Sequence, residues 1–309
     1  MTNKIAYLGP RGSFAEAALK ASGALDSGSD AIPTANVLAA LDAVRAGEVD
    51  AALVPIENSV EGSVSVTLDE LSNGKRLVIV DEVVLPVEFS LLVRPGTDLA
   101  SIKNITTHPH AQAQVRRWID QNVPEAAYIP SMSTASAAES LIAEPSLFDA
   151  AVAQEIAAEI YGLEVLASGI GDNPDASTRF VLVQLPGEIP AATGADKTTL
   201  SLFMRENHPG ALMEILTEFV VRGIDLTRLE SRPTKKSLGD YYFSVDLEGH
   251  VDDLRVSEAL MGLHRVCSDV RFLGSYPRHD GREAHVRPGV TDLDFDSALI
   301  WLNKLKGKS

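Results

Sequence analysis

The sequence has little cysteine, little positive charge and no long apolar run. Its single cysteine, Cys267, excludes an internal disulfide framework and a cysteine-based zinc site, and is typical of a reducing compartment. The 27 Lys and Arg residues are outnumbered by 43 Asp and Glu, and the net charge of -16 argues against nucleic acid or an anionic membrane as a partner. No apolar run reaches the roughly 18 residues of a membrane span, and no signal peptide is visible. We therefore expect a cytoplasmic protein.

Motifs for metals, nucleotides and covalent catalysis are also missing. His108-Pro-His110 is a close histidine pair without a carboxylate at ligand spacing. Gly9-Pro-Arg-Gly12 lacks the Gly-Lys-Ser/Thr of a phosphate-binding loop, and Gly169-Ile-Gly171 lacks the third glycine of a dinucleotide-binding turn. No Gly-x-Ser-x-Gly elbow is present, and Cys267 is interpreted as a core residue on the apolar face of a helix. We expect no metal and no cofactor.

What is present divides into two differently organised parts. Up to residue 186, short apolar strands alternate with amphipathic helices, which predicts α/β units around a largely parallel sheet. A break rich in Pro, Gly and Ala follows at Pro186–Ala195. From Thr198 to Tyr276 the order is β-α-β-β-α-β, which is typical of a ferredoxin-like domain. The polar tail ends in a short amphipathic helix, predicted at Leu293–Leu305.

Polar residues gather where predicted strands end or helices begin, the usual place for a ligand in an open α/β sheet. The turn from Gly9 to Ser13 directs backbone N–H groups toward a helix N-terminus and suits an anion, although an ordinary strand-to-helix turn explains it equally well. Arg179, just before a buried strand, suits a carboxylate; the alternative is a pair with Asp172 or Asp175. Further candidates are Asn58, Ser59, Ser133, Thr134 and Thr178.

Two long motifs identify a family resemblance. Thr178-Arg-Phe-Val-Leu-Val183, with Tyr161-Gly-Leu-Glu and Asp172 before it, resembles the Thr-Arg-Phe signature of prephenate dehydratases. Leu226-Thr-Arg-Leu-Glu-Ser-Arg-Pro233 is similar to the Glu-Ser-Arg-Pro motif of that family's regulatory ACT domain, and Gly210-Ala-Leu-Met213 to its Gly-Ala-Leu motif. Residues 6–14, 55–63 and 108–114 fit as well, so the resemblance runs in order from about residue 4 to 278. The family often has Asn where this chain has Ala176, and no role is given to that position.

The resemblance implies an α/β fold with a two-lobed catalytic domain, like a type II periplasmic binding protein, at residues 1–186. Lobe 1 would comprise about 1–79 and 166–186, and lobe 2 about 80–165, with the site in the cleft between them. A linker at 187–196 would lead to a ferredoxin-like βαββαβ ACT domain at 197–278 and a tail at 279–309. ACT domains would pair, giving a homodimer or a homotetramer.

The implied reaction is the cofactor-free, decarboxylating dehydration of prephenate to phenylpyruvate, CO2 and water in L-phenylalanine biosynthesis. Thr178 would stabilise the departing hydroxyl by a hydrogen bond or relay a proton, because a hydroxyl of high pKa is a poor full proton donor. Arg179 would bind a substrate carboxylate. The resemblance also implies Asn58 and Gln114 as catalytic residues, and the following as substrate-binding residues: Ser13, Ser59, Ser133, Thr134 and Phe180.

L-Phenylalanine would be the feedback inhibitor, bound at the ACT domain by Gly210, Ala211, Leu212, Met213, Glu230, Ser231, Arg232 and Pro233. Gly210 leaves room for a carboxylate beside a helix N-terminus. Glu230 suits the ammonium group, but it can instead pair with Arg232 inside the domain. Two other functions stay open: an arogenate dehydratase, whose substrate differs in one substituent, and a non-catalytic amino-acid-sensing protein.

Overall fold

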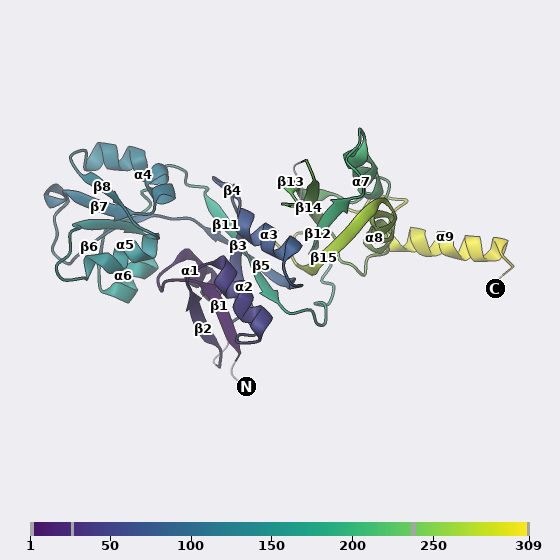
Figure 1. Cartoon of the computed structure of the whole chain (residues 1–309), viewed down its shortest axis with the longest axis horizontal. Helices are drawn as coiled ribbons and strands as arrows, with labels where there is room; N and C mark the ends of the chain where they lie inside the picture. Colours follow the sequence, from purple (N-terminus) through teal and green to yellow (C-terminus); the bar gives the residue numbers. More distant parts are fainter. Residues whose placement is uncertain (1–2, 26–27, 236–238, 308–309) are drawn as a thin grey trace. The chain divides into compact units, whose positions relative to one another are not determined.

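The computed structural model describes residues 3–25, 28–235 and 239–307, and Figure 1 shows its elements. The chain divides into two compact units, one of Met1–Thr67 with Val83–Val181 and one of Leu68–Glu82 with Leu182–Ser309. The segment 68–82 therefore groups with the C-terminal part of the chain. A simple boundary at residue 186 does not describe this division.

The first lobe is built on a sheet with the strand order β2-β1-β3-β11-β5, in which β4 also pairs with β3. Its strands are β1 (Lys4–Leu8), β2 (Asp30–Thr34), β3 (Ala51–Asn58), β4 (Gly62–Ser63), β5 (Val78–Pro86) and β11 (Ser177–Gln184). β1 runs parallel to β2 and to β3, and the helices α1 (Phe14–Ala21) and α2 (Val37–Ala46) connect these strands. All of β5 belongs to this sheet, so the second lobe begins after Pro86 and not near residue 80.

The second lobe has the strand order β10-β6-β9-β7-β8. Its elements are β6 (Ser90–Val93), a 3-10 turn (Leu99–Ser101), β7 (Asn104–Thr107), α4 (Pro109–Asn122), β8 (Ala127–Pro130), α5 (Thr134–Leu141), β9 (Ala150–Ala153), α6 (Glu155–Tyr161) and β10 (Glu164–Ala167). Leu91 and Val152 pack in the cluster that includes α4 residues, whereas Leu92 and Ala151 pack with residues of α5 and α6. Figure 1 shows α4 on one side of this sheet and α5 and α6 on the other. Two α/β lobes, as expected, thus make up the first unit.

The regulatory domain has an antiparallel sheet in the order β13-β14-β12-β15. In chain order its elements are β12 (Asp196–Met204), α7 (Ala211–Val220), β13 (Leu226–Pro233), β14 (Tyr241–Glu248), α8 (Leu254–Val266) and β15 (Cys267–Pro277). This order confirms the predicted β-α-β-β-α-β arrangement. The helix assigned to Cys267 is wrong, because Cys267 is the buried first residue of β15. The apolar pattern of α8 passes into the strand without a polar break, which hides the boundary.

One face of this sheet packs on α7 and α8, and polar side chains of the other face bond to residues 68–82. These residues form the C-terminal part of α3 (Ser65–Asn73) and the start of β5. Arg232 and Tyr242 both bond the Asp69 carboxylate at 3.1 Å, and Lys197 bonds Glu82 at 2.8 and 2.9 Å. We call this contact, between residues 68–82 and the sheet β12–β15, the seam.

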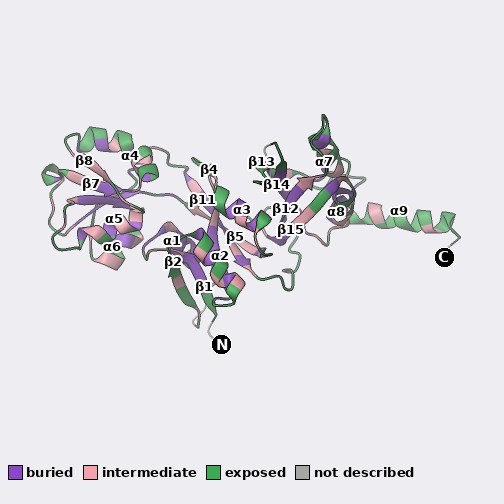
Figure 2. Cartoon of the chain, viewed as in Figure 1, coloured by how far each residue is buried: buried purple, intermediate pink, exposed green. Residues whose placement is uncertain are grey.

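The tail after β15 is fixed to the regulatory domain at its start. Val290 is buried, and Arg287 donates a hydrogen bond to the Val220 carbonyl at 3.2 Å. The helix α9 (Asp292–Leu305) follows, with a capping box formed by Thr291 and Asp294, and confirms the helix predicted there. In Figure 2 α9 is almost entirely exposed. Across the described part of the chain, no helix combines the length and the apolar character that a membrane crossing requires.

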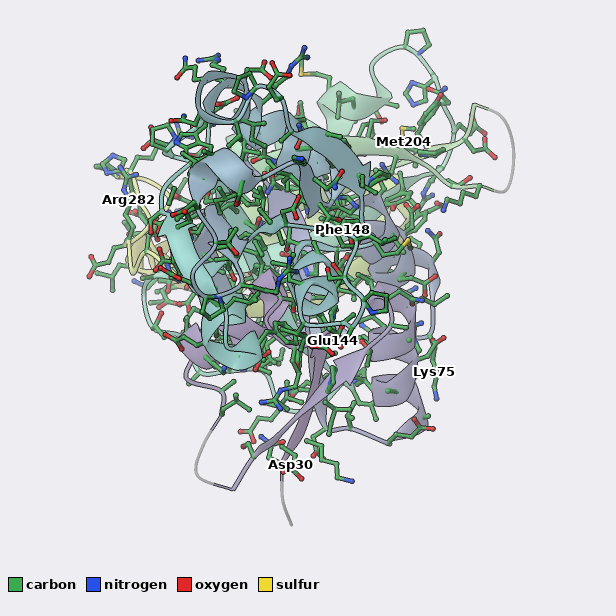
Figure 3. All side chains as sticks on the ribbon, turned by 90° about the vertical axis from the view of Figure 1, so that its left-hand side faces the viewer. Asp30, Lys75, Glu144, Phe148, Met204 and Arg282 are labelled. Carbon is green, nitrogen blue, oxygen red and sulfur yellow. The ribbon has the colours of Figure 1, made fainter. Side chains whose placement is uncertain are left out.

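Five elements of the described structure were not predicted from the sequence patterns, namely β2, β4, α3, β8 and β10. β2 begins at the exposed Asp30, labelled in Figure 3, and contains Pro33, so it shows neither a continuous apolar run nor a clean alternation. α3 carries Ser65, Val66 and Thr67 in its first turn, and these residues have modest helix propensity. Instead, α3 is stabilised by its contacts in the seam, which are made with residues far away in the sequence.

Candidate active site

The first unit holds a cavity of about 790 Å3 to which both lobes contribute. The first lobe supplies Ser13, Phe14, Asn36, Val37, Asn58, Glu61, Val64, Val66, Val87, Thr178 and Phe180, among others. The second lobe supplies Phe89, His108, His110, Ala111, Gln114, Met132, Ser133 and Thr134. The rings of Phe14 and Phe89, one from each lobe, meet edge to face with centroids 5.6 Å apart. The cavity thus combines aromatic walls with a few polar groups, as ligand sites commonly do.

Five described helices have residues of their first turn in the wall of this cavity, namely α1, α2, α3, α4 and α5. The side chains of Ser13, Asn36, His108 and Ser133 cap four of them, α1, α2, α4 and α5. A helix N-terminus presents unpaired N–H groups and a partial positive charge, so it favours an anion. Within the described residues, no lysine or arginine lines the cavity. Attraction for an anion therefore comes from backbone dipoles and uncharged donors.

Asn58 and Thr178 form the central polar contact, although 120 residues separate them in the sequence. The Asn58 Oδ1 accepts hydrogen bonds from the backbone N–H of Val60 and of Glu61, each at 2.9 Å. This fixes the amide so that Nδ2 donates to the Thr178 Oγ1 at 2.8 Å. The threonine oxygen is thus an acceptor toward Asn58, and its own O–H proton remains available for another acceptor.

Arg179 does not join these residues at the cavity. Its neighbours Thr178 and Phe180 both line the wall, and successive side chains of a strand point to opposite faces. The Arg179 guanidinium is buried and pairs with the Glu57 carboxylate at 3.3 Å. Arg179 thus pairs with Glu57, and this contact braces β3, the strand that carries Asn58.

Three of the predicted serines are occupied by local structure. Ser13 donates to the Leu8 carbonyl at 2.7 Å and caps α1, and Ser133 caps α5 while it donates to the Ser136 Oγ at 2.8 Å. Ser59 accepts from the Ser177 N–H at 2.9 Å and so ties the end of β3 to β11. Ser13 and Ser133 reach the cavity wall, whereas Ser59 does not. Of the predicted hydroxyls, Thr134 and Thr178 lie at the wall without a capping role.

Gln114 and His108 approach the cavity from α4. The Gln114 Oε1 is buried, and no hydrogen-bond partner lies near it among the described residues. A buried amide oxygen without a donor is costly, so a ligand donor would relieve it. Burial and the nearby His110 lower the pKa of His108 below its usual 6.5, which favours the neutral ring near pH 7.

Most of the predicted regulatory residues do not line the cavity that the described residues form beside α7. Gly210 caps α7 with a φ of 98°, and apart from its neighbours in the chain no atom of the described residues lies within 4 Å of the position of a Cβ there. A cavity of about 250 Å3 beside α7 is lined by Ala211, together with Met204, Arg205, Glu206, His208, Glu214, Ile215 and Val266. Glu230 to Pro233 are absent from its wall, and Arg232 bonds Asp69 and Glu230 instead. The alternative of a Glu230–Arg232 pair inside the domain is therefore the arrangement present.

Some wall residues were not predicted from the sequence as site residues. His108, His110 and Glu61 line the cavity, as do the first residues of α2. The sequence signal that could have placed α2 at the site is the capping residue Asn36. It stands between a strand and an amphipathic helix, as Ser13 does before α1. No group of three or more His, Cys, Asp or Glu residues in the described ranges is arranged to hold a metal ion.

Two α/β lobes around a cleft, with a ferredoxin-like domain attached, define a ligand-cleft protein with a regulatory domain. Residues 5–187 match the family model described as prephenate dehydratase, and residues 198–265 match the ACT domain. The chain belongs to the prephenate dehydratase family.

Individual relatives agree with this assignment. The chain is 49% identical over 304 residues to a prephenate dehydratase of Mycobacteroides abscessus, covering 97% of this chain and 96% of the relative. A crystal structure of prephenate dehydratase in complex with L-Phe from Arthrobacter aurescens has a TM-score of 0.93 at 49% identity, and 98% and 99% of the two chains are covered. GqqA, described as a novel type of quorum quenching acylase, is 32% identical with a TM-score of 0.78, covering 89% of this chain and 98% of that one.

Proposed function

We propose that this chain is a prephenate dehydratase, which converts prephenate to phenylpyruvate, CO2 and water without a cofactor. The observation that carries the proposal is the Asn58–Thr178 pair at a cavity formed by four capped helix N-termini and aromatic walls. Prephenate is a dianion that becomes aromatic, so a site that favours anions and contacts rings suits both ends of the reaction. A cytoplasmic location fits a biosynthetic role of this kind.

In the reaction, the bond between the ring and its carboxylate breaks, and its electrons enter the ring as CO2 leaves. The electrons of the opposite C–O bond leave with the hydroxyl oxygen, which becomes water after it takes a proton. Thr178 donates a hydrogen bond to this oxygen, and solvent supplies the proton that completes the water. Asn58 supports the step because its donation to the Thr178 oxygen polarises the O–H bond.

The two carboxylates are bound by helix N-termini and by neutral donors, with Ser13, Ser133 and Thr134 at the wall. Phe180, with Phe14 and Phe89, contacts the ring. Gln114 accepts a hydrogen bond from the substrate through its buried Oε1. In this proposal Arg179 and Ser59 act as positioning residues, because their contacts hold β3 and β11 together at the site.

L-Phenylalanine binds the regulatory domain in this proposal and inhibits from there. The open space at Gly210 and the start of α7 suit its carboxylate. Ser231 and Pro233 are exposed and suit contact with a second copy, so the site is completed when two regulatory domains pair. The assembly is thus a homodimer or a dimer of dimers. We expect Gly210→Val to abolish the inhibition without changing uninhibited turnover.

The fold is shared with a protein described as an acylase, which raises the question of nucleophilic chemistry. An acylase needs a base to activate its nucleophile. The partner of the Thr178 oxygen is an amide donor, which cannot remove a proton, so the geometry favours hydrogen bonding to a leaving group.

Adding prephenate and arogenate separately to the purified protein tests the proposal and its close alternative. We expect phenylpyruvate from prephenate, measured by its absorbance, and little phenylalanine from arogenate. Phenylalanine release from arogenate alone would make the protein an arogenate dehydratase. Binding of phenylalanine without turnover of either substrate would make it an amino-acid sensor.

A further inference from the structure

Tyr161 forms a hydrogen bond between the two lobes that the proposed mechanism does not use. Its Oη donates to the Arg11 carbonyl at 2.9 Å, although 150 positions separate the two residues in the sequence. Tyr161 is the last residue of α6 in the second lobe, and Arg11 lies in the turn of the first lobe that leads from β1 into α1. Burial raises the pKa of Tyr161 above its usual 10, so the hydroxyl keeps the proton that it donates.

The turn that Tyr161 reaches has its shape fixed within the first lobe. The Gly12 N–H donates to the Glu16 carboxylate at 2.6 Å, and the Ser13 hydroxyl donates to the Leu8 carbonyl at 2.7 Å. Both bonds join residues of the first lobe. They therefore set the conformation of the turn, whereas its distance from the second lobe has to be set by contacts with that lobe.

The turn and α6 also pack closely at Gly12. The φ of this glycine is 80°, and a Cβ there would lie 3.2 Å from the Ala157 Cβ and 3.4 Å from the Tyr161 Cε2. Glycine thus allows the turn to approach α6. A cavity of about 620 Å3 borders this contact, with Pro10 and Arg11 in its wall, so the turn has room to shift when the hydrogen bond is lost.

Within the second lobe, α6 packs with α5 as one block. Residues of both helices form one buried cluster, and Tyr161 packs against it. The cluster includes Ala137 and Ala138 of α5 and Ala157 and Ala158 of α6. Figure 1 shows the two helices side by side. Because α5 begins at the wall of the catalytic cavity, a bond at the end of α6 also fixes where the N-terminus of α5 lies relative to the turn before α1.

We propose that Tyr161 is a positioning residue, whose hydrogen bond to the Arg11 carbonyl sets the spacing between the N-termini of α1 and α5. The inference rests on the proposed function, in which the two carboxylates of prephenate contact these helix N-termini, one in each lobe. Asn58 and Thr178, which act in the chemical step, both belong to the first lobe. Loss of the Tyr161 hydroxyl therefore weakens the binding of a ligand that needs both helix N-termini and leaves the chemical step almost unchanged.

Steady-state kinetics of Tyr161→Phe test the proposal, with Tyr128→Phe as the matched control. The Tyr128 Oη also donates to a backbone carbonyl, that of Thr107 at 3.2 Å, but both residues lie in the second lobe. We expect Tyr161→Phe to raise KM for prephenate about fivefold, as the loss of one hydrogen bond does, with kcat within about twofold of wild type. Phenylpyruvate has one carboxylate instead of two, so its inhibition constant should change by less than about twofold. Tyr128→Phe should change none of these values.

Direct binding separates this inference from the proposed function. Calorimetry on Thr178→Ala chains, with and without Tyr161→Phe, gives the affinity for prephenate in the absence of rapid turnover. Prephenate binding about fivefold weaker, with phenylpyruvate binding unchanged, supports the positioning role even where the wild type does not turn prephenate over, a result that contradicts the proposed function alone. Equal losses for the two ligands, no loss for prephenate, or the same losses in Tyr128→Phe would overturn the positioning role. A wild-type chain that does not bind prephenate would overturn both.

Discussion

The cleft and the seam differ in whether their polar side chains have partners within the chain. In the cleft, no lysine or arginine lines the described wall, and the Gln114 Oε1 lacks a partner among the described residues. In the seam, charged side chains are buried and satisfied: Asp69 bonds Arg232, and Glu82 bonds Lys197. The cleft keeps its hydrogen-bonding capacity for a ligand, whereas the seam uses it to hold one segment of the chain.

The two ends of the segment 68–82 continue into residues of the cavity wall. The helix α3 contributes Val66, in its first turn, to the cavity wall, and its later residues Asp69 and Ser72 bond the regulatory sheet. β5 likewise holds Glu82 at the seam, and the chain reaches the cavity wall at Val87. Both connections between cavity and regulatory domain are short.

The largest expected effect is on stability at the seam. Lys197→Met removes the cation that pairs with the buried Glu82, which keeps the His279 N–H as a donor, and should lower the free energy of unfolding by about 3–5 kcal/mol. Denaturant titration measures this effect. The double variant Glu82→Gln with Lys197→Met should recover much of the loss, because no charge is left buried. Gln114→Leu in the cleft should cost little, since its Oε1 bonds no group in the described part of the chain. If Gln114→Leu and Lys197→Met lowered the free energy of unfolding by similar amounts, the proposed difference between cleft and seam would be wrong.

The next effect is on catalysis. Thr178→Ala removes one donor aimed at the leaving oxygen and should lower kcat/KM by about 100- to 1000-fold, with KM little changed. Thr178→Ser keeps the hydroxyl and should retain most of the activity, so it controls for packing. Steady-state assays with prephenate give both values. Wild-type turnover by Thr178→Ala would contradict the role of Thr178.

A smaller effect is expected on the stability of the fold at low pH. Burial alone would raise the pKa of Asp69, but hydrogen bonds from Lys235 and Arg232 lower it below the ordinary 3.8. The unfolded chain then binds this proton more readily, so the stabilisation is present above about pH 3.8 and is lost as the pH falls below it. Unfolding measured against pH should show a shallower acid loss in Asp69→Asn. The variant keeps Asp280, whose pKa its hydrogen bond with Arg278 lowers to about 2, so some acid loss persists.

The smallest effect is that of salt on turnover. A dianion approaches a chain of net charge -16, and the cavity wall offers no described lysine or arginine. Long-range attraction therefore contributes little, and modest salt should leave kcat/KM unchanged or raise it by screening the repulsion. A steep fall in kcat/KM between low and physiological salt would mean that cationic side chains guide the substrate.

The element order of the regulatory domain and the helix starts at the cavity follow from local patterns, whereas Gln114 and Phe180 were expected at the site only because of the family resemblance. Amphipathic spacing identifies α7 and α8, and a capping residue before a helix identifies Ser13 and Ser133. The seam is missed because its contacts join residues more than 100 positions apart and because α3 has weak propensity. The prediction that the Arg179 side chain faces the cleft is also wrong. Side chains alternate along β11, so once Thr178 faces the cleft, Arg179 next to it faces away.

Catalysis in the proposed mechanism depends on the Thr178 hydroxyl, which the Asn58 amide polarises, and a double-variant cycle measures this dependence directly. Asn58→Asp keeps an acceptor for the Val60 and Glu61 N–H groups but cannot donate to Thr178, so it removes the polarisation without releasing the loop. Comparing kcat/KM for Thr178→Ala, Asn58→Asp and the double variant gives the coupling between them. We predict a double variant no slower than the slower single variant, because both changes disable the same donor. Losses that simply multiply would show that Asn58 and Thr178 act independently and would contradict the account.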